Sequence, residues 1–222
     1  MAALRALVAA AGIAASGVAL AAGGHHTVDD ASLIEPGHCE IEGWHTRAQG
    51  GQRLSHAGLG CGVGPVELGL STEHARDSGT GSTAQGVQLK WAREWTPHIS
   101  AGFSITGNWA AQEHPSYQGT TVSALMTWAL RDNIHLHVNV GRDFLRSQPG
   151  SARSGVALDW SPMSEAWLLA AERYVEGRTP FSRVGLRWHA SSRTTLDVSR
   201  AQKLGDPRSS SWTVAATWAF QR

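Results

Sequence analysis

Segments in which apolar and polar side chains alternate recur along most of this chain, and this pattern limits its fold more than any other feature. In "ISAGFSITGNWA", Ile99, Phe103 and Ile105 alternate with Ser104 and Thr106. A period of two residues is that of a β-strand, whose two faces then differ in polarity. We therefore expect an all-β chain, built from strands with one apolar and one polar face.

Turn signals divide the chain into twelve such segments, most of them about ten residues long. The expected strands span 38–47, 52–61, 65–74, 84–95, 98–110, 120–131, 134–144, 153–163, 165–176, 181–191, 194–203 and 210–220. A tilted strand needs about 9–11 residues to cross a bilayer, whereas strands of soluble sheets more often have about five or six. The length favours a transmembrane barrel over the alternative, a secreted soluble sandwich or barrel.

The polar faces of these strands carry charged side chains, among them Glu67, Arg183 and Arg187. Burying many charges in a soluble core would be costly, but they are ordinary in the wet lumen of a membrane barrel. The apolar faces would then point outward to lipid. The sequence thus predicts an antiparallel up-and-down transmembrane β-barrel of about twelve strands, with both chain ends on the periplasmic side.

The connections between the expected strands alternate in length. Short turns such as "TP", "DN" and "SS" alternate with longer connections such as "ARDSGTGST" and "AQEHPSYQG". Outer-membrane barrels have short periplasmic turns and longer outer loops. On this layout tryptophans gather near the strand ends, Trp109 at the outer end and the others at the periplasmic end, as an aromatic girdle against outer-membrane lipid. The girdle residues are Trp95, Trp109, Trp128, Trp160, Trp167, Trp188 and Trp218.

The N-terminus has the layout of a secretory signal peptide, with Arg5, an apolar stretch and a final Ala-Leu-Ala site. We expect 1–21 to be removed, 22–37 to form a polar periplasmic leader and 38–220 to form the barrel. The alternative for the first segment is an uncleaved membrane helix. Export and a barrel together indicate the outer membrane of a Gram-negative bacterium.

Over its mature length the chain resembles the Gram-negative outer-membrane β-barrel proteins, in particular their small monomeric porin-like class. Its last strand, "SWTVAATWAF", is similar to the C-terminal strand that the barrel-assembly machinery recognises, which ends in an aromatic residue. Here Gln221 and Arg222 follow Phe220, so that recognition has to tolerate an extension. In size and strand count the chain resembles the twelve-stranded channels that pass acidic oligosaccharides or nucleosides, and no motif selects one subfamily.

Cys39 and Cys61 are the only cysteines, and export brings them into an oxidising compartment. Folding the first two expected strands about Gly50 sets the two residues opposite each other. The Cα separation across an antiparallel pair is within reach of a disulfide. We expect a disulfide that joins the first hairpin.

The leader contains candidate metal ligands in His25, His26, Asp29 and Asp30. If cleavage follows Ala22, the new amino terminus and His25 would complete a square-planar site for Cu(II) or Ni(II). A cut one residue earlier spoils that chelate, and the segment is then only a polar leader or a plug strand. No other cofactor is expected.

Twelve strands lie between filled barrels of about eight and open porins of about sixteen, which indicates a narrow pore or small-solute channel. The expected pore-lining residues are Glu67, Glu73, Lys90, His135, His137, Asn139, Asp159, Arg183, Arg187 and His189. The formal net charge of +1 is spread along the chain, so no basic patch for nucleic acid is expected.

Two alternatives to a channel stay open. The first is a non-conducting structural or interaction barrel with a metal-binding leader. The second is an outer-membrane lipid enzyme, because His189 and Ser191 lie two residues apart on one strand, as in twelve-stranded phospholipases. No third group orients the histidine as a base, so we expect no catalytic residue and no enzyme.

Overall fold

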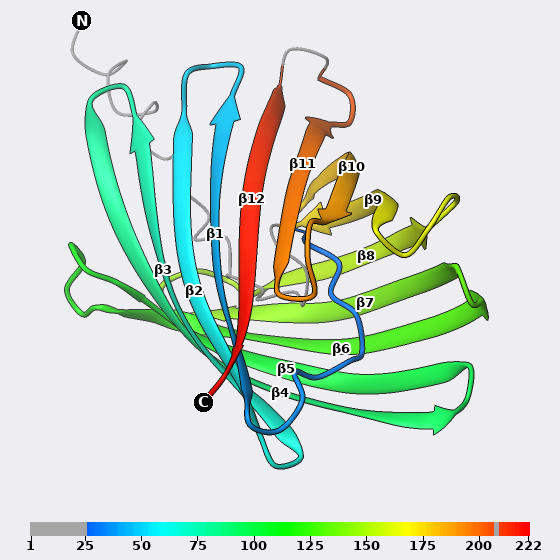
Figure 1. Cartoon of the computed structure of the whole chain (residues 1–222). Coiled ribbons are helices and arrows are strands. Elements are labelled where there is room, and N and C mark those ends of the chain that lie inside the picture. The colour runs from blue at the N-terminus through cyan, green and yellow to red at the C-terminus, as the bar shows by residue number, and fades with distance from the viewer. Residues whose placement is uncertain (1–25, 207–208) are drawn as a thin grey trace, which may run out of the picture.

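The computed structural model describes residues 26–206 and 209–222, which form a closed barrel of twelve antiparallel strands (Figure 1). Each strand pairs with its sequence neighbours, and β1 closes the barrel against β12. The strands are β1 (His38–Ala48), β2 (Arg53–Val63), β3 (Val66–Asp77), β4 (Thr80–Thr96), β5 (Ile99–Ala110), β6 (Tyr117–Arg131), β7 (Ile134–Leu145), β8 (Ser151–Trp160), β9 (Trp167–Glu176), β10 (Thr179–His189), β11 (Thr194–Lys203) and β12 (Ser210–Gln221). The predicted all-β, antiparallel up-and-down barrel is confirmed. No helix of the described residues is long and apolar enough to cross a membrane.

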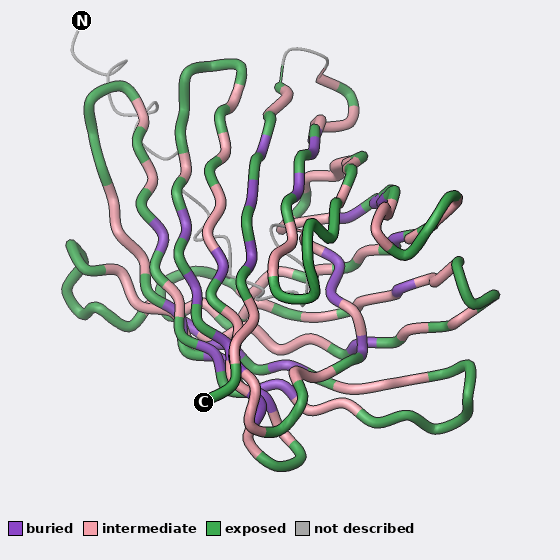
Figure 2. Tube along the Cα trace, in the orientation of Figure 1, coloured by how far each residue is buried: buried purple, intermediate pink, exposed green. Residues whose placement is uncertain are grey.

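The two faces of each strand differ in burial as the alternation predicts (Figure 2). On β5, Ile99, Phe103 and Ile105 are 38%, 39% and 40% exposed, whereas Ser104 and Thr106 are 7% and 4% exposed. The apolar side chains therefore point away from the barrel and the polar ones point into it. This orientation is that of a membrane barrel and the reverse of that in a soluble one.

Strict alternation of short and long connections is wrong at three places: the outer β3–β4 and β9–β10 connections have only two residues each, and the periplasmic β8–β9 connection has six. β4 begins at Thr80 rather than at residue 84, because β3 and β4 continue outward to a tight turn. Ser78 and Gly79 in this turn both have positive φ, as a two-residue hairpin turn requires. The expected long loop "ARDSGTGST" is therefore mostly strand. β8 ends before Pro162, which cannot donate to the ladder, and its connection to β9 is longer than expected.

The tryptophans of the predicted girdle lie outside the barrel, near the strand ends. Five of them are between 41% and 62% exposed: Trp95, Trp128, Trp160, Trp188 and Trp218. Trp167 stacks on Trp188, with ring centroids 5.6 Å apart. Trp109 lies at the opposite end, 5.8 Å from the ring of Tyr117. We predict that these rings contact lipid, and their position outside the barrel supports this prediction.

Cys39 and Cys61 form the predicted disulfide, with Cα atoms 4.1 Å apart. They are direct partners in the β1–β2 register, and Cys39 also pairs with Phe220 of the last strand. The bond therefore holds β1 to β2 beside the seam where the first and last strands close the barrel.

Replacing both cysteines by serine is expected to lower the free energy of unfolding by about 3 kcal/mol, because the bond restricts the unfolded chain. The two residues are 22 positions apart. Denaturant unfolding of the detergent-solubilised barrel, followed by tryptophan fluorescence, measures the difference. Reductant should lower the midpoint of the wild type only, and equal midpoints for oxidised and reduced wild type would contradict this role.

Candidate functional site

The described part of the leader, residues 26–37, crosses the lumen before it enters β1 (Figure 1). Its backbone N–H groups donate to inward-facing side chains on four strands. The bonds run from Thr27 to Glu172 (3.3 Å), from Asp29 to Asn139 (2.6 Å), from Ala31 to Thr127 (2.8 Å) and from Ile34 to Glu67 (3.1 Å). The expected position for 22–37 was periplasmic. The described residues of this segment, from 26 on, lie in the lumen because barrel side chains supply the partners that their extended backbone lacks.

Inward-facing glycines leave the space that the leader occupies. A Cβ atom on Gly62 would collide with the carbonyl oxygens of Ile34 and Glu35. A Cβ atom on Gly155, on the other side of the barrel, would lie 2.5 Å from Val28 Cγ2. The wall is thus shaped for this segment at both ends of its path.

Lys90 holds the centre of the leader. Its side chain is fully buried, and Nζ lies 2.9 Å from Asp29 Oδ1 and 3.4 Å from Asp30 Oδ1, while Glu67 adds a third interacting carboxylate. Burial, only partly opposed by Lys90, raises the pKa of Asp29 to about 7. Burial also opposes ionisation of Asp30, but Lys90 and Ser32 outweigh it and lower the pKa. One ammonium group therefore serves three carboxylates, and Asp29 is the one that takes up a proton near neutral pH.

Raising the pH through about 7 is expected to loosen the leader. The docked leader binds a proton at Asp29 that a released leader, with an ordinary pKa of 3.8, would give up. The stabilisation of the docked leader by this proton is complete below the ordinary pKa of Asp29, and it is lost as the pH rises through the raised pKa. Protease cleavage of the leader, measured between about pH 5 and about pH 9, should increase with pH. Asp29→Asn should flatten the profile, and an unchanged slope in that variant would contradict the assignment.

Several other charges of the lumen are paired between neighbouring strands. The pairs are Arg153 with Asp143 (3.4 Å) and Glu176 (3.2 Å), Arg183 with Glu172 (3.5 Å), Arg187 with Asp197 (2.7 Å) and His137 with Asp159 (3.5 Å). Each cation of this set faces a carboxylate, but Arg153 faces two and Lys90 serves three, so carboxylates outnumber cations in the lumen. A preference for cations over anions is therefore expected.

A second buried cluster lies where β1, β2 and β3 meet. His56 lies between Glu42 and Glu73, with nitrogen–oxygen distances of 3.0 and 3.4 Å. Its ring stacks on Trp44, with centroids 4.7 Å apart. These contacts fill the lumen on the side of the seam.

The predicted pore-lining residues lie at inward-facing positions of their strands, and His189 lies at the exposed end of β10. Glu67, Lys90 and Asn139 contact the leader. That these residues line a solute path stays a prediction. Six further inward-facing residues were not predicted as pore-lining, although each lies on the polar face of its strand: Glu42, His56, Asp143, Arg153, Glu172 and Asp197.

The predicted metal ligands are divided. Within 26–206 and 209–222, no group of three or more His, Cys, Asp or Glu side chains is placed to hold a metal ion. His25 lies outside the described residues, so the copper or nickel site stays a prediction. His26 Nδ1 lies 2.6 Å from Glu172 Oε1, and Asp29 and Asp30 face Lys90.

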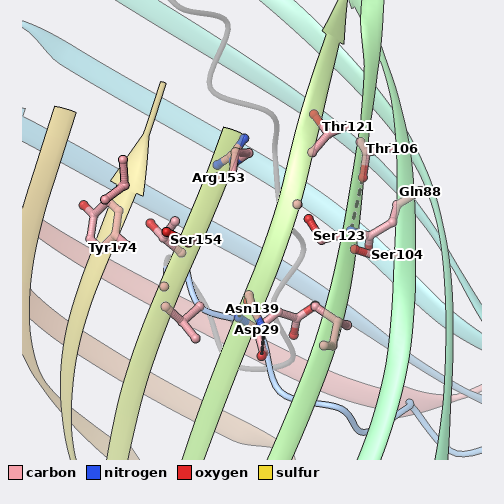
Figure 3. Close-up of a pocket in the computed structure, with 16 residues that line it drawn as sticks. Asp29, Gln88, Ser104, Thr106, Thr121, Ser123, Asn139, Arg153, Ser154 and Tyr174 are labelled. Atoms are coloured by element: carbon pink, nitrogen blue, oxygen red, sulfur yellow. Dashed lines mark hydrogen bonds between the residues drawn. The ribbon is translucent and has the colours of Figure 1, made fainter. Parts of the chain in front are cut away.

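A small pocket of about 30 Å³ lies on the side of the leader that faces the outer loops (Figure 3). Val28 and Asp29 of the leader form its floor, and its walls come from β4 to β9. Most of the polar lining is uncharged, including Gln88, Ser104 and Thr106. The barrel thus holds a small polar recess whose floor is its own leader.

The fold is similar to that of solved porins and channels. The KdgM porin aligns with a TM-score of 0.67 at 12% identity, over 82% of this chain and 99% of that one. The NanC porin aligns with a TM-score of 0.62 at 8% identity, over 80% and 98%. The CymD monoaromatic hydrocarbon channel aligns with a TM-score of 0.52 at 10% identity, over 86% and 90%. At these identities the likeness shows the fold alone, that of a porin-like outer-membrane barrel.

No curated protein matches the sequence of the chain. A family profile described as "Uncharacterised conserved protein UCP029691" matches residues 10–220. Because this match spans nearly all of the chain, the protein belongs to the family Uncharacterised conserved protein UCP029691.

Proposed function

We propose that the protein is an outer-membrane channel for small solutes, whose lumen is narrowed by its own leader. The observation that carries the proposal is the closed twelve-stranded barrel whose polar side chains point into a lumen, with a small polar pocket of about 30 Å³ above the leader. Solute sites of small-molecule carriers and channels are concave recesses in which a few polar groups fix the ligand. The porins and the hydrocarbon channel that share the fold support a transport role.

The location and the assembly route belong to the same proposal. The signal peptide 1–21 would direct the chain to the periplasm of a Gram-negative bacterium and would then be cleaved. The barrel-assembly machinery would recognise β12 and insert the barrel into the outer membrane. The exposed apolar faces and the outward tryptophans would then contact lipid. In this proposal the protein binds solutes or lets them pass, and it catalyses no reaction.

A non-conducting structural barrel is the second candidate. The leader that crosses the lumen favours it, as do the paired charges of Arg183 and Arg187. In that case the lumen would be filled for stability, and the leader would never leave it.

Single-channel recording in planar bilayers separates the two candidates. The wild type should conduct weakly or in rare openings, and a variant that lacks residues 26–33 should conduct steadily, because the contacts that cross the lumen are gone. A heat-modifiability gel confirms that both proteins are folded barrels.

A peptide with the sequence of residues 26–36 is the matched control. It should block the shortened variant, whereas a peptide of the same composition in scrambled order should not. If both barrels are folded and electrically silent, the channel is rejected and the structural barrel takes its place.

A further inference from the structure

Four arginines and a tryptophan form a row on the outside of the barrel, near the outer-loop ends of the neighbouring strands β11, β12, β1, β2 and β3 (Figure 1). Each member is the direct register partner of the next, and such partners lie on the same face of an antiparallel sheet. From β11 to β3 the row consists of Arg200, Trp212, Arg47, Arg53 and Arg76. We call these five residues the arginine row.

The arginine row faces away from the lumen. Its members alternate with the buried, inward-facing residues of the same strands, such as Glu42 on β1 and Glu73 on β3. All four arginines are exposed, and Trp212 is 57% exposed. The row therefore lies outside any path that a solute could take through the barrel, and its partner has to come from the surroundings of the barrel.

The charge of the arginine row is not neutralised by the protein. Within residues 26–206 and 209–222, no ion pair includes any of its four arginines. The outward-facing positions of the twelve described strands carry no aspartate or glutamate. Like charges directly opposite each other across strands destabilise a sheet, and here Arg47, Arg53 and Arg76 follow one another in register. An anion from outside would relieve this repulsion.

A hollow of about 500 Å³ opens beside one end of the arginine row. Arg53, His74 and Arg76 line it together with the β3–β4 turn. The only carboxylate in its lining, that of Asp77, accepts a hydrogen bond from Gln52 Nε2 at 2.8 Å. A guanidinium group binds phosphate through two parallel hydrogen bonds. The hollow therefore suits a phosphorylated head group of about the size of a sugar.

Apolar side chains lie directly below the arginine row, toward the middle of the barrel wall. Val214 follows Trp212 on the outward face of β12 and is 57% exposed, and its register partner Val198 on β11 is 39% exposed. The guanidinium carbon of Arg200 lies 6.0 Å from the centroid of the Trp212 ring. Aromatic and basic side chains above an apolar band are typical of the boundary between head groups and acyl chains. A ligand at this place would meet cations at one end and apolar surface at the other.

We propose that the arginine row binds the phosphate groups of an acylated, phosphorylated sugar lipid in the outer leaflet, which is the chemistry of lipid A. The proposal goes beyond the channel function and rests only on the proposed location in a Gram-negative outer membrane. The phosphates accept hydrogen bonds from Arg47, Arg53 and Arg76, and the sugar occupies the hollow. The acyl chains lie along Val198 and Val214, so that the bound lipid covers the seam between β1 and β12 from outside.

Titration of the refolded, detergent-solubilised barrel with bisphosphorylated lipid A, followed by native mass spectrometry, tests the proposal. The wild type should bind the lipid. A variant with Arg47→Gln, Arg53→Gln and Arg76→Gln should bind it about 100-fold more weakly, because each basic side chain near an anionic lipid surface contributes a factor of about five. A heat-modifiability gel reports whether the variant is a folded barrel, as its exposed and unpaired positions lead us to expect.

The matched control removes the same three charges at the opposite end of the barrel. It carries Arg93→Gln, Arg131→Gln and Arg193→Gln, which change exposed arginines near the periplasmic ends of the strands. This protein should bind lipid A as the wild type does. An equal loss of binding in both triple variants would show that only net charge matters, and it would overturn the site.

Two further probes separate a lipid from a soluble anion. The same bisphosphorylated disaccharide without acyl chains, and inorganic phosphate, should each bind at least about tenfold more weakly than lipid A, because they make no contact with the apolar side chains below the row. If the disaccharide without acyl chains binds as tightly as lipid A, the lipid is rejected as the ligand.

The failure of this proposal differs from the failure of the channel. Equal binding of lipid A by the wild type and the variant of the arginine row overturns the lipid site, even if the barrel conducts. A barrel that binds lipid A through these arginines but never conducts rejects the channel and keeps the lipid site. Membrane fractionation of the producing cells tests the location separately from both.

Discussion

Replacing Lys90 by methionine is expected to release the leader from the lumen and to raise single-channel conductance. Lys90 is fully buried and pairs with Asp29 at 2.9 Å and Asp30 at 3.4 Å. Without it, buried carboxylates face one another with no cation between them. Breaking a buried pair costs about 3–5 kcal/mol, so the ratio of docked to released leader should fall by about two to four orders of magnitude. Protease cleavage of the leader and bilayer conductance both measure this change.

Lys203, the other lysine of the chain, provides the matched control. It lies at the outer-loop end of β11, and Lys203→Met should leave leader protection and conductance unchanged. Adding Asp29→Asn and Asp30→Asn to Lys90→Met removes the repulsion and should restore part of the protection. A Lys90→Met barrel with a protected leader and wild-type conductance would show that Lys90 does not hold the segment.

Replacing Gly62 by alanine should also expel the leader, without any change of charge. The added Cβ atom would overlap the carbonyl oxygens of Ile34 and Glu35, and backbone atoms cannot rotate away as a side-chain tip can. Overpacking typically costs about 1–3 kcal/mol. The strand is held by the neighbouring disulfide at Cys61, so the leader is the part that moves. Leader cleavage by protease and a larger steady conductance are the expected readouts.

Gly43→Ala on β1 is the comparison for this variant. The nearest atom to a Cβ there is the carbonyl oxygen of His56 at 3.6 Å, an ordinary contact. This protein should behave as the wild type in both assays. If Gly62→Ala folds, as a heat-modifiability gel reports, and still keeps its leader protected, then the glycine does not shape the wall for the leader.

The barrel wall could be predicted because its information is local. Each strand carries its own alternation, as in Ile105 against Ser104, and the outward and inward faces follow from it directly. The disulfide followed in the same way from a hairpin centred on Gly50, with Cys39 opposite Cys61. Strand ends were harder to predict, because the β3–β4 hairpin continues through residues with turn-like composition.

The contents of the lumen could not be predicted in this way. The leader has no period of two, and its partners are distant in sequence, 61 residues from Asp29 to Lys90 and 145 from Thr27 to Glu172. The alternation along a strand shows whether a residue faces lipid or the lumen, but it does not show what fills the lumen. A local signal was present at Gly62, an inward position where a polar side chain would be expected. A glycine there indicates another backbone close by.

The leader continues directly into β1 at His38, so a released leader stays attached to the barrel that it closes. It competes for its own lumen at an effective concentration of about millimolar, whatever the number of protein molecules present. Opening and reclosing should therefore be unimolecular, with rates that do not change on dilution. A solute or peptide in free solution competes with this tethered segment. It displaces the leader only when the ratio of its concentration to its dissociation constant exceeds the same ratio for the leader.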